Sequence, residues 1–297
     1  MAKFTETNFD AWRKPASDHE EVKLESARQL VNKALDNSAE LAKIKYEVFG
    51  QGSYANDTNV RLNSDIDLNV MYRDEFFYEL PTGKTNKDFN FELSDKLAFG
   101  AYKDMIERAL VNEFGRDFVK RQNKCLRVLA TDTREECDVV PTFEFRRFSE
   151  NGNFVTGVRF VSDEGKAIKG FPKQHTANAI EKNKLTGRSF KRATRIFKRL
   201  RHKMKSDNVA FPDSITSFLI ECLMWNVPNK IYNESTTWSG IVRESIIYLY
   251  NATKAKETCK EWGEVSELLY LFHSGRKWTV EGVNEFLVIL WNYLELE

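Results

Sequence analysis

An alternating stretch at residues 66–72 constrains the fold of this chain more than any other feature. Apolar and polar residues alternate along it, which is the pattern of a half-buried β-strand. Side chains two positions apart share one face of a strand, so Asp65 and Asp67 project together while Ile66 and Leu68 face the core. Two neighbouring carboxylates repel each other unless a cation lies between them. Since Mg²⁺ prefers carboxylate and phosphate oxygens, the stretch predicts a sheet that carries a metal site.

Two further segments supply the remaining parts of such a site. A turn at Gly52 and Ser53 can bring a backbone N–H and a hydroxyl close to a phosphate. Asp138 lies between two apolar residues, so on a strand beside the first one its carboxylate would meet the other two. Two metal ions about 3.5–4 Å apart, held by three carboxylates, can activate an attacking hydroxyl and stabilise a leaving pyrophosphate. Each segment alone is more often structural, but the three in this order favour catalysis.

The remaining pattern separates a mixed first part of the chain from a helical second part. We therefore expect an α+β fold whose helical part begins near residues 150–175. Helices are expected at 20–48, 94–114, 182–205, 212–226, 239–253, 258–272 and 280–295, strands at 66–72, 125–130, 137–145 and 154–161, and a polar loop at 80–90.

Composition excludes several classes of protein. The 45 Lys and Arg residues balance 44 Asp and Glu residues, so the whole-chain charge does not point to nucleic acid or membrane. No stretch approaches the ~18 uninterrupted apolar residues of a membrane span. The four cysteines are far apart and form no CxxC pair, which argues against a disulfide framework or structural zinc. The polar N-terminus resembles no secretory signal, and we expect a cytoplasmic protein.

Five separated motifs, taken in order, resemble one known family. The order of a Gly-Ser turn, an Asp-x-Asp strand and a distant single Asp is similar to that of the DNA polymerase β superfamily of nucleotidyltransferases. The wider match resembles the bacterial CD-NTases, the cyclic GMP-AMP synthase/DncV-like enzymes of anti-phage signalling. The motifs that carry this resemblance lie at residues 52–61, 64–68, 137–141, 175–187 and 190–201, followed by 212–221.

The resemblance implies a fold, an activity and a set of partners. The fold would be a two-lobed polymerase β-like nucleotidyltransferase core, with a mixed sheet and helices, plus a C-terminal helical domain. Residues 1–165 would form the catalytic domain with its N-terminal helix, and residues 166–297 the helical domain that completes the nucleotide-binding cleft. The activity would be the joining of ribonucleoside triphosphates into a cyclic di- or trinucleotide with release of pyrophosphate.

The same resemblance implies a cofactor and binding partners. Two Mg²⁺ or Mn²⁺ ions would bind Asp65, Asp67 and Asp138, and Asp138 would accept the proton of the attacking hydroxyl. The substrates would be nucleoside triphosphates, ATP and also UTP. The product would activate a separate effector protein. The enzyme would be a monomer that needs neither a membrane nor nucleic acid.

The basic segment 182–205 has three interpretations: a solvated surface, a duplex-binding stripe or a phosphate clamp. The resemblance disfavours the stripe, and a triphosphate needs cations besides the metal ions. Lys198 is the first candidate for a triphosphate ligand and Lys191 the second. The other basic residues of the segment, Arg201 among them, are expected to be exposed.

Three further positions are candidates for nucleotide binding. Ser217 and Phe218 open an apolar helix, and in the resembling family such a pair contacts phosphate and stacks on a base; one hydroxyl bonded to the preceding turn is the structural alternative. Asn178 could read a base edge and admit a pyrimidine, or could cap a helix. His175 could contact a lid or lie on the surface.

Two rival functions remain open from the sequence. A transferase on the same fold could make linear oligonucleotides or add a tail to RNA. A non-catalytic nucleic-acid sensor could use the basic segment, although the complete set of three aspartates argues against it.

Overall fold

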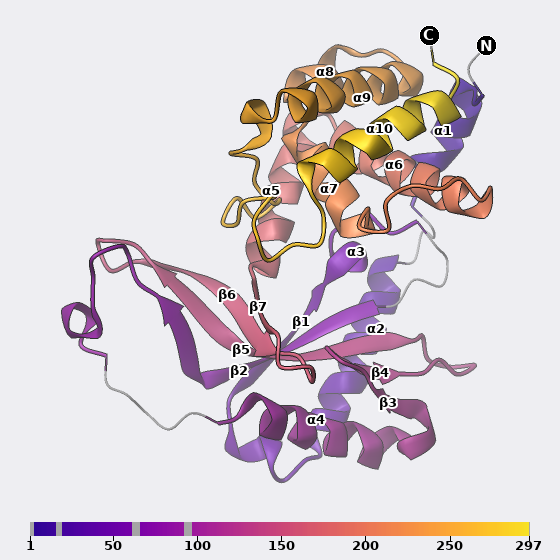
Figure 1. Cartoon of the computed structure of the whole chain (residues 1–297). Coiled ribbons are helices and arrows are strands. Elements are labelled where there is room, and N and C mark those ends of the chain that lie inside the picture. The colour runs from indigo at the N-terminus through magenta and orange to yellow at the C-terminus, as the bar shows by residue number, and fades with distance from the viewer. Residues whose placement is uncertain (1–2, 16–19, 61–65, 92–96, 297) are drawn as a thin grey trace. The chain divides into compact units, whose positions relative to one another are not determined.

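The computed structural model describes residues 3–15, 20–60, 66–91 and 97–296. The chain forms two compact units (Figure 1). The sheet unit consists of residues 19–55 and 61–173, and the helical unit consists of residues 1–18, 56–60 and 174–297. The helical unit thus takes in an N-terminal segment and a five-residue insertion, neither of which is adjacent in sequence to its main part.

A mixed sheet of seven strands forms the centre of the sheet unit. The strand order is β1-β2-β5-β4-β3, with β6 paired to β5 and β7 paired to β6. Strands β2 and β5 run parallel and the other neighbours run antiparallel. The strands are β1 (Tyr46–Gln51), β2 (Ile66–Glu79), β3 (Val119–Arg121), β4 (Leu126–Val128), β5 (Cys137–Phe148), β6 (Phe154–Val161) and β7 (Ala167–Gly170).

Helices α2 (Glu20–Asp36) and α4 (Phe99–Phe114) cover one face of this sheet (Figure 1). The alternate residues Ile66, Leu68 and Val70 of β2 are fully buried against them, as the alternating pattern predicts. Short helical turns complete the unit: α3 (Gly52–Ala55), η1 (Leu41–Lys43), η2 (Asn86–Phe89) and η3 (Arg116–Phe118).

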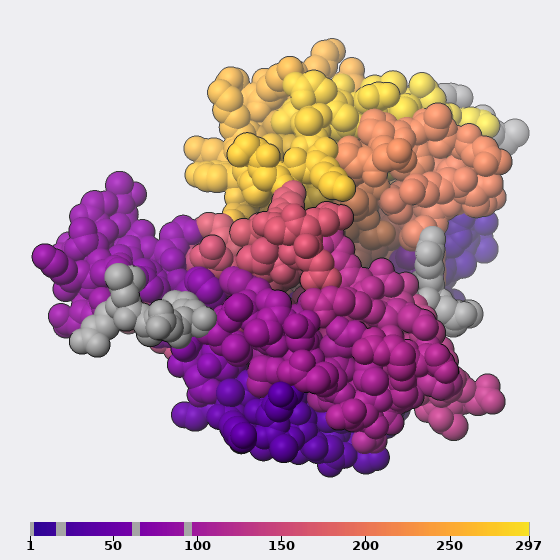
Figure 2. Space-filling model, turned by 60° about the horizontal axis from the view of Figure 1, so that its bottom comes forward, coloured from indigo at the N-terminus to yellow at the C-terminus, as the bar shows by residue number. Residues whose placement is uncertain are grey.

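The far ends of β2, β5 and β6 project with η2 as an arm of the sheet unit (Figures 1 and 2). Aromatic rings hold this arm together with centroid separations of 4.8–6.4 Å. The rings belong to Phe76, Tyr78, Phe89, Phe91, Phe148 and Phe154. The arm therefore has a small apolar centre of its own, apart from the one between the sheet and its two helices.

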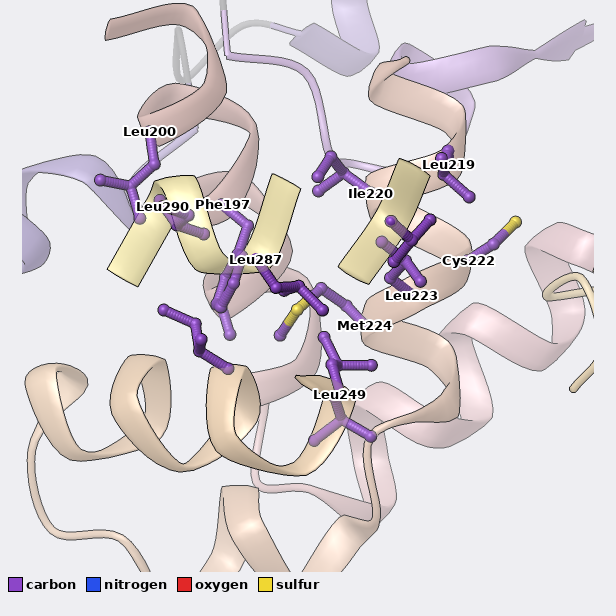
Figure 3. Close-up of a cluster of buried hydrophobic side chains, with 14 of the residues drawn as sticks. Phe197, Leu200, Leu219, Ile220, Cys222, Leu223, Met224, Leu249, Leu287 and Leu290 are labelled. Atoms are coloured by element: carbon purple, nitrogen blue, oxygen red, sulfur yellow. The ribbon is translucent and has the colours of Figure 1, made fainter. Parts of the chain in front are cut away.

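Helix α6 (Ser189–Ser206) lies at the centre of the helical unit. Its apolar side chains, including Phe197 and Leu200, pack against the other helices of the unit (Figure 3). Those helices are α1 (Glu6–Trp12), α5 (Pro172–Leu185), α7 (Ser217–Asn226), α8 (Asn229–Glu234), α9 (Trp238–Ala255) and α10 (Val280–Tyr293), with the short turn η4 (Glu257–Cys259). No helix among the described residues is long and apolar enough to cross a bilayer.

Three of the expected helices were wrong in extent or in kind. The helix expected over 20–48 ends at Asp36, because residues 46–51 pair with β2 as an edge strand. The helix expected over 182–205 is interrupted at Gly187 and Arg188, which both adopt positive φ. The segment 258–272 is mostly irregular, since Gly263 pairs with Tyr270 and the intervening Glu267 also has positive φ.

Candidate active site

Asp67 and Asp138 occupy facing positions on two neighbouring parallel strands. The register of β2 and β5 pairs Asp67 with Asp138 directly. The residues that flank them along the strands are buried in the core, so both carboxylates lie on the opposite face of the sheet, as the sequence predicts. Asp65 lies outside the described residues.

The turn at Gly52 lies directly against Asp67. Gly52 follows β1 at a φ of +71°, and a Cβ at this position would overlap the Oδ2 atom of Asp67. Only glycine combines that backbone conformation with such a close approach. Ser53 follows in α3, whose Tyr54 is buried and anchors the turn. The structure thus brings Gly52, Asp67 and Asp138 together, and Ser53 directly follows Gly52 in the chain.

A cavity of about 440 Å³ opens beside the two carboxylates. Four side-chain amides contribute to its wall and can both donate and accept hydrogen bonds. One of them, Asn69, is held by Gln51 at 3.2 Å and by the hydroxyl of Thr142 at 2.6 Å. The lining consists of Gln51, Asp67, Asn69, Gln122, Asn123, Lys124, Cys125, Arg127, Asp138, Val140, Val158 and Phe160.

Arg127 forms a bidentate ion pair with Asp138 in the lining of this cavity. Its Nε and Nη2 atoms donate to the two carboxylate oxygens at 2.9 and 3.1 Å. The pair crosses between β4 and β5, where the two residues face each other in register. Nearby, burial and the charge of Asp138 raise the pKa of the Cys125 thiol to about 12, so this thiol stays protonated and is no nucleophile at neutral pH.

The donor set fits a divalent cation. Carboxylates on one sheet face are the ligands that such ions prefer, and at Gly52 the backbone approaches the Asp67 carboxylate more closely than any larger residue would allow. Within the described ranges no group of three or more His, Cys, Asp or Glu side chains is arranged to hold a metal ion. Two of the three predicted metal ligands lie inside those ranges.

The helical unit contains a buried polar network centred on Glu221 of α7. Lys198 of α6 donates to its Oε2 atom at 2.6 Å and to the hydroxyl of Thr58 at 2.8 Å. Thr58 in turn donates to Glu221 at 2.9 Å, and the Nε2 atom of His175 lies 2.9 Å from the Oε1 atom. All four side chains are buried. His175 is thus an interior residue and does not lie on the surface.

Opposing effects set the protonation of Glu221. Burial alone would raise the pKa of this carboxyl, but the charge of Lys198 and the hydrogen bond from His175 outweigh it and hold the pKa well below the ordinary value of 4.5. A lowered carboxyl pKa stabilises the fold above about pH 4.5, and that contribution disappears as the pH falls toward the folded-state pKa.

Lys191 differs from the other buried basic residues of α6. It is 7% exposed, yet among the described residues its ammonium has no hydrogen-bond or ion-pair partner. Desolvation lowers its pKa, although Asp57 and Glu221 act in the opposite direction. An incoming anion could therefore pair with this ammonium without breaking an existing hydrogen bond.

Other basic residues of the segment contradict the expectation that they are exposed. Arg195 is buried and donates to the backbone carbonyl of Arg13 at 2.7 Å and to the carboxylate of Asp57 at 3.1 Å. Arg201 is buried and donates to the carbonyl of Ile215. The expectation was wrong because α6 is central to its unit, so that both faces of the helix meet protein.

Ser217 and Phe218 begin α7, after Thr216 caps the helix by accepting from the N–H of Leu219. Phe218 is 38% exposed, unlike the buried residues that follow it. Its ring lies 5.9 Å from that of His175 and 6.0 Å from that of Trp278. A partly exposed aromatic ring can stack on a planar group.

Asn178 lies within α5 and is not a helix cap. Its amide nitrogen donates to the carbonyl of Val265 at 2.8 Å, and its oxygen accepts from Gln174 at 2.6 Å. The amide therefore joins α5 to the irregular segment after α9. Whether it also reads a base stays a prediction.

Sequence reasoning missed Arg127, Thr58 and Glu221. Arg127 alternates with apolar residues on a strand and could have been placed on the face of Asp138. Thr58 and Glu221 are 163 residues apart and carry no local signal that joins them.

Comparison with known proteins agrees with this geometry. A family model for the cGAS/DncV-like nucleotidyltransferase C-terminal helical domain matches residues 177–295. A cyclic dipyrimidine nucleotide synthase CdnE of Cecembia lonarensis is 54% identical, with 99% of this chain and 100% of that protein covered. A second protein of the same description, from Legionella pneumophila, is 35% identical with 98% of each chain covered.

Solved structures give the same result for the fold. The CdnE cyclic dinucleotide synthase of Elizabethkingia meningoseptica with GTP and Apcpp superposes with a TM-score of 0.81 at 32% identity, covering 98% of this chain and 99% of that one. The c-UMP-AMP synthase CdnE of Rhodothermus marinus with Apcpp and Upnpp gives a TM-score of 0.84 at 26% identity, covering 97% and 95%. The expected α+β core with a C-terminal helical domain is confirmed.

Gly52→Ala is expected to abolish turnover while the protein stays folded, because the new Cβ displaces the Asp67 carboxylate. Gly83→Ala is the matched control, since Gly83 has a similar φ of +82° and open space around it. Both changes carry the same backbone strain, roughly 1 kcal/mol. Product formation and thermal unfolding are measured for both. Equal activity in the two variants would contradict the close approach of Gly52 to Asp67.

Lys198→Met is expected to lower the free energy of unfolding by about 3–5 kcal/mol, since it leaves the Glu221 carboxylate buried with one fewer partner. Adding Glu221→Leu should recover part of that loss, because the unpaired buried charge is then gone while His175 and Thr58 lose their acceptor. Lys203→Met is the control on the same helix, where an exposed pair with Asp207 is worth at most about 1 kcal/mol. Urea unfolding measures all three, and a double variant no more stable than Lys198→Met would contradict the network.

Proposed function

The chain belongs to the cGAS/DncV-like nucleotidyltransferase (CD-NTase) family, and we propose that it joins two pyrimidine nucleoside triphosphates into a cyclic dinucleotide. It is a cyclic nucleotide synthase, and its product is a second messenger. Each of the two bond-forming steps would release pyrophosphate. We expect the messenger to act on a separate effector protein.

The pairing of Asp67 with Asp138 carries this proposal. Two carboxylates face each other across parallel strands, and a glycine turn lies against one of them. A nucleotidyltransferase needs such a cluster to bring an anionic triphosphate next to a ribose hydroxyl. The adjacent cavity of about 440 Å³ is in the size range of small-molecule sites.

The residues of the sheet unit divide the chemistry among them. Asp138 would accept the proton of the attacking ribose hydroxyl, and its partner Arg127 orients its carboxylate. The backbone N–H groups at Gly52 and the hydroxyl of Ser53 would bind phosphate oxygens. A divalent ion held by Asp65, Asp67 and Asp138 would neutralise the charge that develops on the phosphates.

The helical unit would supply the remaining contacts with the triphosphate and base. Lys191 is the stronger candidate for a phosphate ligand, since its ammonium has no hydrogen-bond or ion-pair partner among the described residues. Lys198 is held by Glu221 and Thr58, which makes it a weaker candidate than the sequence suggested. Ser217 would add a hydroxyl, and the exposed ring of Phe218 would stack on a base.

The choice of pyrimidines rests on the relatives. Base usage differs among proteins of about 30% identity, which include a cyclic dipurine nucleotide synthase and a cyclic UMP-AMP synthase. The two proteins described as cyclic dipyrimidine nucleotide synthases are 54% and 35% identical to this chain. The amides that line the cavity can match uracil or cytosine, but they do not exclude purines.

Incubation with all four nucleoside triphosphates and Mg²⁺ or Mn²⁺, followed by mass spectrometry, tests the proposal. From the mixture we expect a phosphatase-resistant dinucleotide that contains two pyrimidines. The same kind of product should form when UTP, or CTP, is the one nucleoside triphosphate supplied. A purine in the product would overturn the pyrimidine assignment. Linear, phosphatase-sensitive products would favour the linear-oligonucleotide or RNA-tailing alternative.

Lys191→Ala is expected to raise the KM for nucleoside triphosphate by about 10- to 100-fold, which corresponds to one charge-assisted hydrogen bond of about 1.5–3 kcal/mol. The thermal midpoint should stay near that of the wild type, because the ammonium has no hydrogen-bond or ion-pair partner among the described residues. Lys205→Ala, at an exposed position of the same helix, is the control. If both variants raise the KM equally, Lys191 does not bind the triphosphate.

A further inference from the structure

Arg127 introduces a positive charge into the cluster that the proposed function assigns to a divalent cation. Its guanidinium donates to both oxygens of Asp138, at 2.9 and 3.1 Å, and lies 3.6 Å from the carboxylate of Glu136. Asp67 and Arg127 also line the same cavity. The side chain is 33% exposed.

In the absence of metal, the positive charge of Arg127 should stabilise the carboxylates around it. Carboxylates gathered on one sheet face destabilise one another, and a cation among them removes that repulsion. A guanidinium matches a carboxylate through two parallel hydrogen bonds, which also fixes the carboxylate plane. Arg127 can therefore keep Asp138 in place before any metal ion arrives.

The same charge opposes a divalent ion once one arrives. A dication near Asp138 would be repelled by the guanidinium, and at a few ångströms this repulsion remains substantial in a half-buried site. Removal of the arginine charge should therefore strengthen metal binding while it weakens the metal-free fold. A purely structural salt bridge would show only the second effect.

We propose that Arg127 is a positioning residue that serves as an internal counter-cation for the metal site. It holds Asp138 in the metal-free enzyme and lowers the affinity of the site for a bare divalent ion. Metal binding is then favoured when the negative charge of a triphosphate arrives with it. This inference rests on the proposed function, because it takes Asp67 and Asp138 to be metal ligands.

The chain offers a matched control in Arg146. This residue donates to Glu144 on the same strand β5 at 2.7 Å, and Glu144 is buried. Loss of the Arg146 charge should lower stability as loss of any such partner does. It should leave metal affinity unchanged, because neither residue lines the cavity beside Asp67.

The experiment uses the full chain and Mn²⁺ alone, without nucleotide. Binding is followed by the Mn²⁺ electron paramagnetic resonance signal, and thermal unfolding is recorded with and without the ion. Arg127→Gln is expected to unfold at a lower temperature without metal and to bind Mn²⁺ at least about tenfold more tightly than the wild type. Arg127→Lys keeps the charge and should retain an affinity near that of the wild type.

The outcomes separate this inference from the proposed function. If Arg127→Gln binds Mn²⁺ no more tightly than the wild type, or if Arg146→Gln changes affinity as much, the inference is overturned while the metal site stands. If neither the wild type nor Arg127→Gln binds Mn²⁺ better than Asp67→Asn, the metal site itself is overturned and the inference with it. Arg127→Met serves as a second neutral variant should Arg127→Gln fail to fold.

Discussion

The buried carboxylate of Glu221 organises the polar interior of the helical unit. It binds Lys198 from α6, His175 from α5 and Thr58 from the inserted segment 56–60. That segment belongs to the helical unit, although its neighbours in the chain on both sides belong to the sheet unit. Residues 56–60, which lie between Gly52 and Asp67 in the chain, thus take part in a buried network of charges that would be costly to break.

In the sheet unit, the parallel pairing of β2 with β5 positions the two carboxylates. Strands β2 and β5 are far apart in sequence, yet their register places Asp67 beside Asp138, and the flanking apolar residues lock that register by filling the core. A slip of β2 by one residue would turn Asp67 into the interior and away from Asp138. The core and the site thus depend on the same alternation, which allows a short motif to specify both.

That alternation is also why the sequence predicted this part of the molecule well. The strand period was sufficient to predict β2, β5 and the shared face of Asp67 and Asp138. The order of the motifs was sufficient to predict the family. The local sequence pattern gave wrong predictions where contacts with residues distant in sequence determine secondary structure or burial. Residues 46–51 are a strand because β2 pairs with them, and Arg201 is buried because α6 is surrounded by other helices. The partner of Lys198 is 23 residues away on another helix, so neither charge indicates the pair alone.

The chain has nearly equal numbers of acidic and basic residues, but its buried basic side chains differ in the partners that they have. Several buried basic side chains are matched by specific oxygens: Arg195 by Asp57, Arg201 by a backbone carbonyl and Lys182 by the carbonyls of Trp225 and Val227. Basic side chains with such partners stabilise the fold, and they would have to break these hydrogen bonds to bind a ligand. Lys191 departs from that pattern because, among the described residues, nothing pairs with it. Arg201 and Lys182 have backbone carbonyls as partners, so Lys191 is the position on α6 where an anion from solution would add a hydrogen bond without breaking one, and this is why we propose it as a triphosphate ligand.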